Sequence, residues 1–440
     1  MDTNDPLTTP LAPIKLVVDR PPSAMMFASP MDGTALLPPL RRRRVATASA
    51  SLLGASRVAG LVALVLMGLV LPGTAHAQDG GSAKPDQVFR VHPRTGKVAA
   101  LTGTITENSL ETVRLDRGGK ESSYAASEIL RIVWGDVPPP YRDGSTYAER
   151  GDHENAVARF RVAAGDASAR EVVRADARLR AARELLAWGA RDAHRFTECA
   201  AEAARFLTDF PNNREVPQAR WLKGRATRLA GDPASAAADF RALYEEGAND
   251  PPTAGYPRAL CLDAGLAAAR AFLATGDTGS ARALFTALEG SYQQAASALE
   301  DTASADRVHL LSGAGEASIG EGYCLLAGGQ TSQAVRYFEG KLGRADLPAS
   351  ARFSASLGLA ESYLASGELR KAQIEFAKVS SLDFTDRDRN ARALVGMSDA
   401  ALKINDSRAK ADAKLWLTKV GEVFGDTPSA AKAATLLAKL

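Results

Sequence analysis

One ten-residue pattern recurs along most of this 440-residue chain and constrains its fold more than any other feature. The pattern is a glycine, four residues, an alanine, three residues and a phenylalanine. Its five copies are Gly151/Ala156/Phe160, Gly231/Ala236/Phe240, Gly276/Ala281/Phe285, Gly329/Ala334/Phe338 and Gly367/Ala372/Phe376. Self-similarity with a period of a few tens of residues indicates a solenoid, whose units bury their apolar faces only by stacking.

Each copy predicts the turn and the second helix of a helical hairpin. The glycine ends the first helix, because a positive φ is cheap only without a Cβ. The alanine and the phenylalanine then share one face of the next helix, where the small residue allows close approach and the ring fills the space between units. A further small residue lies seven positions before the turn glycine, at Gly224, Ala269, Gly322 and Ala360. We therefore expect a mainly α protein, with an α-solenoid of about six or seven hairpins over residues 143–440.

The pattern resembles the tetratricopeptide repeat (TPR), and residues 357–379 match it best. Successive turn glycines from Gly231 to Gly367 are 45, 53 and 38 residues apart, whereas the family repeat is about 34 residues long. We therefore expect longer helices or inserted loops, for instance at residues 249–252 and 288–304. The resemblance implies a non-enzymatic scaffold of the bacterial exported type, which binds a protein or peptide partner in the cell envelope.

In the family that the chain resembles, the first helices of successive hairpins line a concave groove for the partner. Counting back from the turn glycines, the resemblance implies seven groove residues: Arg225, Arg228, Asp263, Arg270, Glu316, Tyr323 and Glu361. The three arginines would face an acidic or carboxylate-bearing segment, and Tyr323 would pack on it. The alternative for each of the seven is an ordinary solvated helix face.

Residues 1–77 have the three parts of a secretory signal peptide. Four arginines at residues 41–44 precede an apolar run at residues 58–71, and Ala75-His76-Ala77 follows as a small-x-small cleavage signature. The run is shorter than the roughly twenty residues of a membrane span. We expect cleavage after Ala77 and a periplasmic or secreted product. The alternative is an uncleaved leader that anchors the protein in the inner membrane.

Removal of this leader makes the remaining chain neutral. The leader holds seven of the 54 lysines and arginines and four of the 51 aspartates and glutamates, so 47 of each remain. Residues 85–137 likewise hold seven basic and seven acidic residues. A nucleic-acid partner is therefore not expected, because it would require a basic patch.

The hydrophobic period changes from helical to alternating between residues 86 and 134, which predicts a small β domain at residues 85–137. Arg117-Gly118-Gly119-Lys120 predicts a hairpin turn. About five short strands of this kind resemble an SH3-like or Sm-like barrel, and the alternative is a β-rich cap on the first repeat. Three prolines then predict a stiff extended linker at residues 138–142. The residues expected to face the interior of the sheet are Leu101, Gly103, Ile105, Val113, Leu115, Leu130, Ile132 and Trp134.

The sequence contains no signature of catalysis, cofactor binding or metal binding. It lacks a His-Glu-x-x-His pair, a glycine-rich phosphate loop and a Gly-x-Ser-x-Gly elbow. Cys199, Cys261 and Cys324 are far apart and lie on helical patterns, so we expect small buried core residues. We expect no enzyme activity, no cofactor and no metal; the alternative is an active site assembled across repeats.

The leader generates a direct prediction. The exported protein should begin at Gln78, because cleavage follows Ala75-His76-Ala77. N-terminal sequencing of the protein from its own cells checks this. A membrane-bound chain that still carries residues 58–71 would show instead that the leader is an anchor.

Overall fold

A computed structural model describes residues 84–92, 97–248 and 253–440. The expected leader, its apolar run and its cleavage site lie outside these residues, as does the expected insertion at residues 249–252. Residues Gln78–Leu440 form one compact unit. No helix in the described segments is long and apolar enough to cross a membrane.

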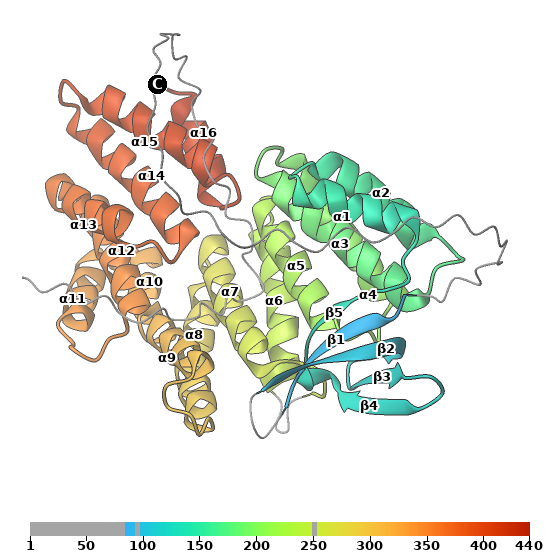
Figure 1. Ribbon diagram of the computed structural model, residues 1–440. Coiled ribbons are helices and arrows are strands. Elements are labelled where there is room, and N and C mark those ends of the chain that lie inside the picture. Colours follow the sequence, from blue (N-terminus) through green and yellow to red (C-terminus); the bar gives the residue numbers. More distant parts are fainter. Residues whose placement is uncertain (1–83, 93–96, 249–252) are drawn as a thin grey trace, which may run out of the picture. The chain divides into compact units, whose positions relative to one another are not determined.

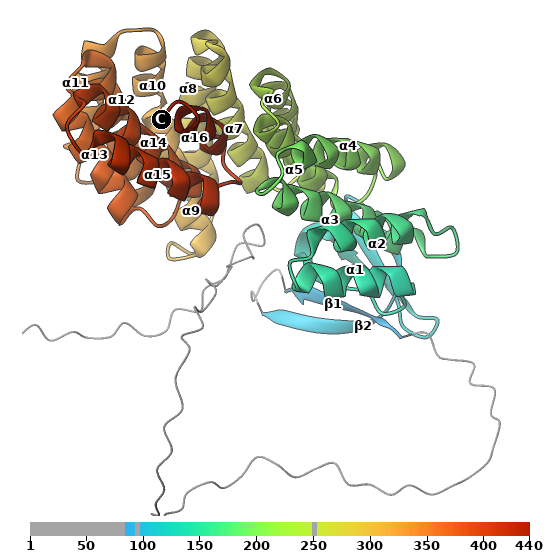
Figure 2. The same cartoon turned by 90° about the horizontal axis from the view of Figure 1, so that it is seen from above.

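The described residues contain sixteen α-helices that pack in succession as seven hairpins and a final helix (Figures 1 and 2), as the repeated pattern predicts. The chain is thus an α-solenoid of TPR-like hairpins. In the fifth hairpin the first helix is split into α9 and α10. In the other six hairpins the first helix is continuous, and these first helices are α1, α3, α5, α7, α12 and α14. The helices are α1 (Pro139–Glu149), α2 (His153–Gly165), α3 (Glu171–Gly189), α4 (His194–Asp209), α5 (Val216–Leu229), α6 (Pro233–Ala248), α7 (Arg258–Thr275), α8 (Thr278–Ser297), α9 (Ala305–Ser318), α10 (Gly320–Ala327), α11 (Thr331–Leu342), α12 (Ala349–Ser366), α13 (Leu369–Leu382), α14 (Arg387–Ile404), α15 (Ala409–Val423) and α16 (Ser429–Leu437).

All five predicted turn glycines adopt the left-handed conformation. Their φ values lie between 71° at Gly151 and 92° at Gly231. The last hairpin uses Asn405 at the equivalent place, with φ 56°, because asparagine is the residue that best replaces glycine at a helix end.

The phenylalanine of each pattern fills the space between hairpins only because small residues face it. Phe376 is fully buried, and a Cβ added at Gly396 of the next first helix would lie 2.3 Å from its ring. Phe338 is also fully buried, and Gly322 and Gly358 approach it in the same way from both sides. Such close contact fixes how one hairpin packs on the next.

The long interval between Gly276 and Gly329 is explained by two departures from the regular repeat. Helix α8 runs for 20 residues, and the following first helix is interrupted at Ile319, between α9 and α10. Ile319 is itself buried, so the interruption lies in the core. The sequence predicted the extra length, but not where the helix breaks.

Five strands precede the helices and form an antiparallel sheet in the order β4-β3-β2-β1-β5. The predicted turn is confirmed: Gly118 and Gly119 have positive φ, and the Arg117 N–H donates to the Lys120 carbonyl. A 3₁₀ helix, η1 (Ala126–Glu128), leads into the last strand. Pairing does not join β4 to β5 within the described sheet, so hydrogen bonds do not close it into a barrel. The strands are β1 (Asp86–Val91), β2 (Val98–Asn108), β3 (Thr112–Asp116), β4 (Glu121–Ala125) and β5 (Ile129–Val133).

One inward residue predicted from alternation is wrong. Leu130 is 54% exposed, and Ile129 takes the buried place. Opposite β1, the pairing passes from Phe89–Arg131 to Arg90–Ile129, which leaves Leu130 as an extra residue. This bulge changes the side on which the following residues lie.

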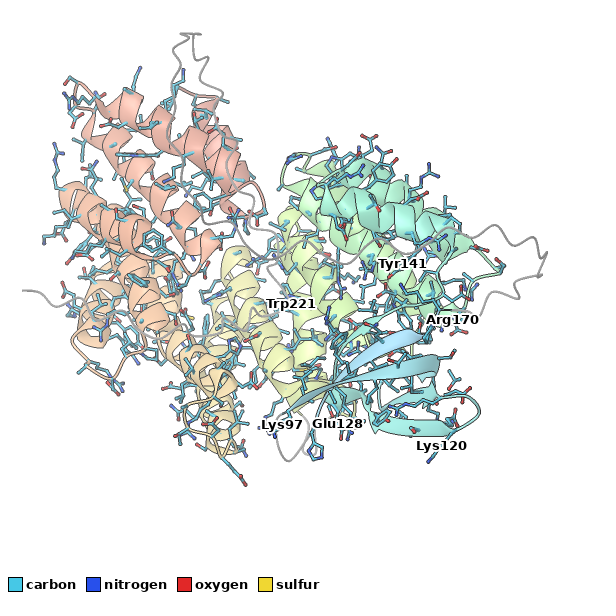
Figure 3. All side chains as sticks on the ribbon, in the orientation of Figure 1. Lys97, Lys120, Glu128, Tyr141, Arg170 and Trp221 are labelled. Carbon is cyan, nitrogen blue, oxygen red and sulfur yellow. The ribbon has the colours of Figure 1, made fainter. Side chains whose placement is uncertain are left out.

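The sheet shares a core with the first helices. Val88 and Trp134 of the sheet region pack in one cluster with Tyr141 and Phe160 of the first hairpin. At the edge of this core the buried Asp86 accepts two hydrogen bonds, each 2.8 Å long, from Arg170. Figure 3 labels Arg170 beside the sheet. Burial alone would raise the pKa of Asp86, but Arg170 and two backbone N–H groups hold it below its ordinary value.

The segment predicted as an extended proline linker is wrong in part. Pro138 caps helix α1, and Pro139 and Pro140 occupy its first positions. Proline suits the first turn of a helix, because its φ is already helical and its missing N–H has no intrahelical partner there. The sheet therefore continues directly into the solenoid.

The packing of Phe376 generates a stability prediction. Phe376→Ala should lower the free energy of unfolding by about 3 to 5 kcal/mol, because a fully buried ring is lost beside Gly396. Urea denaturation measures the change. Phe384→Ala is the matched control, since Phe384 is 86% exposed and its loss should change stability by less than about 0.5 kcal/mol. Equal unfolding curves for the two variants would show that the hairpins do not pack through Phe376.

Candidate functional site

The inner side of the solenoid contains a partly open cavity of about 790 Å³. Its walls come from the first helices α5, α7, α12 and α14, from α9 and α10, and from the turn between α3 and α4. The last helix, α16, and the turn before it complete the lining. A cavity of this size is typical of sites for small ligands and short segments.

The cavity is completed by a contact between the second hairpin and the turn that follows the last one. Gly425, in the turn after α15, lies so close to the α3–α4 turn that an added Cβ would be 2.2 Å from the Ala190 carbonyl oxygen. Arg387 also contacts this turn, because its guanidinium donates hydrogen bonds to the Asp426 carboxylate and to the Val423 carbonyl. The second hairpin and the end of the last hairpin therefore meet beside the cavity.

Five of the seven groove residues implied by the family resemblance line this cavity. They are Arg228, Arg270, Glu316, Tyr323 and Glu361. Arg225 lies on α5 and Asp263 on α7, but neither is part of the lining. Asp263 instead accepts a hydrogen bond from the Tyr292 hydroxyl and pairs with His309. The hydrogen bond between His309 and Asp263 raises the pKa of His309.

Glu316 is the centre of a buried ion-pair network rather than a free groove residue. One of its oxygens lies 2.8 Å from Arg389 of α14, and the other lies 3.0 Å from Arg270 of α7. The Ser354 hydroxyl of α12 donates to Glu316 and accepts from Arg389. These contacts join the inner faces of four successive first helices.

Arg389 is held by carboxylates on two sides. Besides Glu316, it contacts the fully buried Asp383 at 2.5 Å. Burial alone would lower the pKa of Arg389, but these two carboxylates raise it. Removal of one partner from such a buried pair is strongly destabilising, so the network has a structural role.

Tyr323 and Glu361 are held in a second group around Arg392. Both Glu361 oxygens lie within hydrogen-bond distance of the same Arg392 nitrogen, at 2.8 and 2.9 Å. The Arg392 guanidinium lies over the Tyr323 ring at 5.6 Å, and the Tyr323 hydroxyl donates to the Ser354 carbonyl. The ring also packs edge-on against Phe338. Tyr323 is thus fixed by its neighbours.

Arg228 differs from the other arginines of the cavity that lie on first helices. It is partly buried, yet among the described residues its side chain makes no ion pair and no hydrogen bond, and its Nε atom is buried without a partner. Burial lowers the pKa of Arg228, against the attraction of Asp388. The side chain remains charged at neutral pH, because arginine is always protonated in proteins. An unpaired arginine side chain of this kind can bind an anion.

The sequence analysis missed the contribution of α14. Asp386, Asp388, Arg389 and Arg392 all line the cavity. Their register could not be counted back from a turn glycine, because Asn405 takes that place. An asparagine at the position of the turn glycine was the sequence signal that could have identified α14 as a first helix.

The three cysteines are buried free thiols, as predicted. Burial raises the pKa of Cys199 to about 12 and that of Cys261 to about 12. The pKa of Cys324 is raised to about 11 by the same cause. In the part of the chain that the structure covers, no group of three histidine, cysteine or acidic side chains could hold a metal ion.

Comparisons with known proteins add little to this geometry. No protein-family model matches the chain, and no curated protein matches it. One similar solved structure is the crystal structure of a tetratricopeptide repeat protein from Parabacteroides merdae ATCC 43184. It is 14% identical, with 64% of this chain and 91% of that chain covered, and the TM-score is 0.42. A similarity at this level carries no inference about function.

Proposed function

We propose that the protein is a non-enzymatic, exported scaffold that binds a protein or peptide partner on the inner side of its solenoid. The cavity of about 790 Å³, lined by successive first helices, carries this proposal. Solenoids use such concave surfaces for binding. The alternatives are a membrane-anchored scaffold with an uncleaved leader, an enzyme, and a nucleic-acid binder.

The charges of the cavity favour a binding surface over an active site. Glu316 and Glu361 are both held by arginines, at 2.8 Å in each case. Catalytic carboxylates need to exchange protons with a substrate, whereas these two are engaged in fixed ion pairs. Export rests on residues 1–77, and N-terminal sequencing tests it.

We further propose that the small sheet is related to SH3-like domains. The order β4-β3-β2-β1-β5, in which the last strand returns beside the first after a 3₁₀ helix, supports this. The sheet covers the first hairpin and shares its core, so it also serves as a cap. If the sheet is needed as a cap, deletion of residues 84–137 should abolish cooperative unfolding of the helices; an unchanged transition would show that it is dispensable.

Filling the cavity should prevent partner binding. Ala274 is exposed and lines the cavity, so Ala274→Trp should reduce the recovery of co-purifying proteins and peptides by about tenfold or more, a loss of about 1.4 kcal/mol. Quantitative mass spectrometry after affinity purification from envelope extracts measures this.

Ala283→Trp is the matched control for this variant. Ala283 is also an exposed helical alanine, but it lies on α8 and outside the cavity lining. Both substitutions should leave stability within about 0.5 kcal/mol. Equal recovery with the two variants would move the binding surface away from the cavity.

A further inference from the structure

We propose that the cavity binds a zwitterionic dipeptide, with its carboxylate on Arg228 and its ammonium group on Asp388. This inference rests on the proposed function and narrows its partner to a short peptide with both ends free. It depends on which charges of the cavity are already neutralised.

Most charged groups of the cavity are paired with one another. Glu316 forms ion pairs with Arg270 and Arg389, and Glu361 forms one with Arg392. Asp386 caps helix α14 through the Arg389 N–H. A ligand that paired with any of these side chains would first have to displace an existing ion pair, at a cost in desolvation.

Arg191, Arg228 and Asp388 are the exceptions. Arg191 is exposed, in the turn after α3, whereas the Arg228 Nε atom is buried without a partner. The Arg228 side chain has no hydrogen-bond or ion-pair partner in the described chain, and the Asp388 carboxylate accepts one long hydrogen bond, 3.4 Å, from the Ser429 hydroxyl. The two side chains attract each other, but no ion pair joins them within the described residues. Among the described residues that line the cavity, one unpaired cation with a buried Nε, Arg228 of α5, and one unpaired carboxylate, Asp388 of α14, are therefore available to a ligand.

A ligand with a single charge would satisfy only half of this arrangement. An anion on Arg228 would be repelled by Asp388, and a cation on Asp388 would be repelled by Arg228. A molecule that carries both charges pairs with both residues and leaves neither charge buried alone. The complementary ligand is therefore a zwitterion.

The size and the lining of the cavity favour a dipeptide. Its two charged ends are at most about 7 Å apart, because two extended residues span that length. The rest of the wall includes Leu273, Leu326 and Leu357, which suit apolar side chains. A volume of about 790 Å³ holds two side chains of any kind.

The test uses a pool of randomised dipeptides in three forms: with free ends, N-acetylated and C-amidated. Equilibrium dialysis against the purified protein, with mass spectrometry of the retained peptides, measures binding. The protein should retain the free pool at least about tenfold more than either blocked pool, because each block removes one buried charge pair.

Two variants test which residue binds the carboxylate and which binds the ammonium group of the dipeptide. Arg228→Gln should lose the preference for a free carboxylate but keep the preference for a free ammonium group, and Asp388→Asn should do the reverse. A loss of folding would instead lower the retention of all pools together. Arg241→Gln and Asp346→Asn are matched controls outside the cavity and should behave as the parent.

Equal retention of the three pools, or retention of none, would overturn the proposal. So would variants that alter both preferences equally, because each residue is assigned to one end. A negative result combined with partner recovery that is lost only in Ala274→Trp would leave the scaffold function standing. Loss of both would remove the cavity as a binding site.

Discussion

The contact between a phenylalanine ring and the small residues that face it determines the geometry of this solenoid. Phe338 and Phe376 have no exposed surface, and glycines of the neighbouring first helices come so close to them that a Cβ would overlap the ring. Each hairpin therefore packs on the next in one way, and deviations in packing geometry do not add up from hairpin to hairpin. Because the stacking is fixed, the chain can return on itself, so that Gly425 meets Ala190 beside the partly open cavity.

Local chemistry made the repeat predictable from the sequence. A turn that needs positive φ selects glycine, and the five glycines of the pattern have such values. The same reasoning failed where a local signal has two physical meanings. Prolines 138–140 fit an extended linker and also the first turn of a helix. Alternation placed Leu130 inside, but a bulge reverses its side, and bulges leave little trace in a hydrophobic pattern.

Part of the cavity lining follows from the sequence, but the pairing of its charges does not. The family resemblance implies groove positions for Arg228, Arg270 and Glu316, and the structure places these three residues in the cavity lining. Their partners depend on residues far along the chain: Glu316 and Arg389 are 73 positions apart. Which arginine is neutralised and which stays unpaired therefore follows from closure of the solenoid, a long-range property. The network stabilises the inner wall, and two residues that it leaves unpaired, Arg228 and Asp388, give the cavity its selectivity.

Closure of the solenoid is the central claim, because the cavity exists only if the last hairpin reaches the α3–α4 turn. Spin labels on Ala193→Cys of the α3–α4 turn and Ala431→Cys of α16, two exposed positions that line the cavity, report this separation by pulsed dipolar spectroscopy. The native thiols do not interfere, since all three are buried and burial raises their pKa values to about 11 or 12. One narrow distribution, short enough to span a single cavity, is predicted. A broad distribution at long distances would mean that the α3–α4 turn and the last hairpin do not meet, and would contradict the cavity and the functions proposed for it.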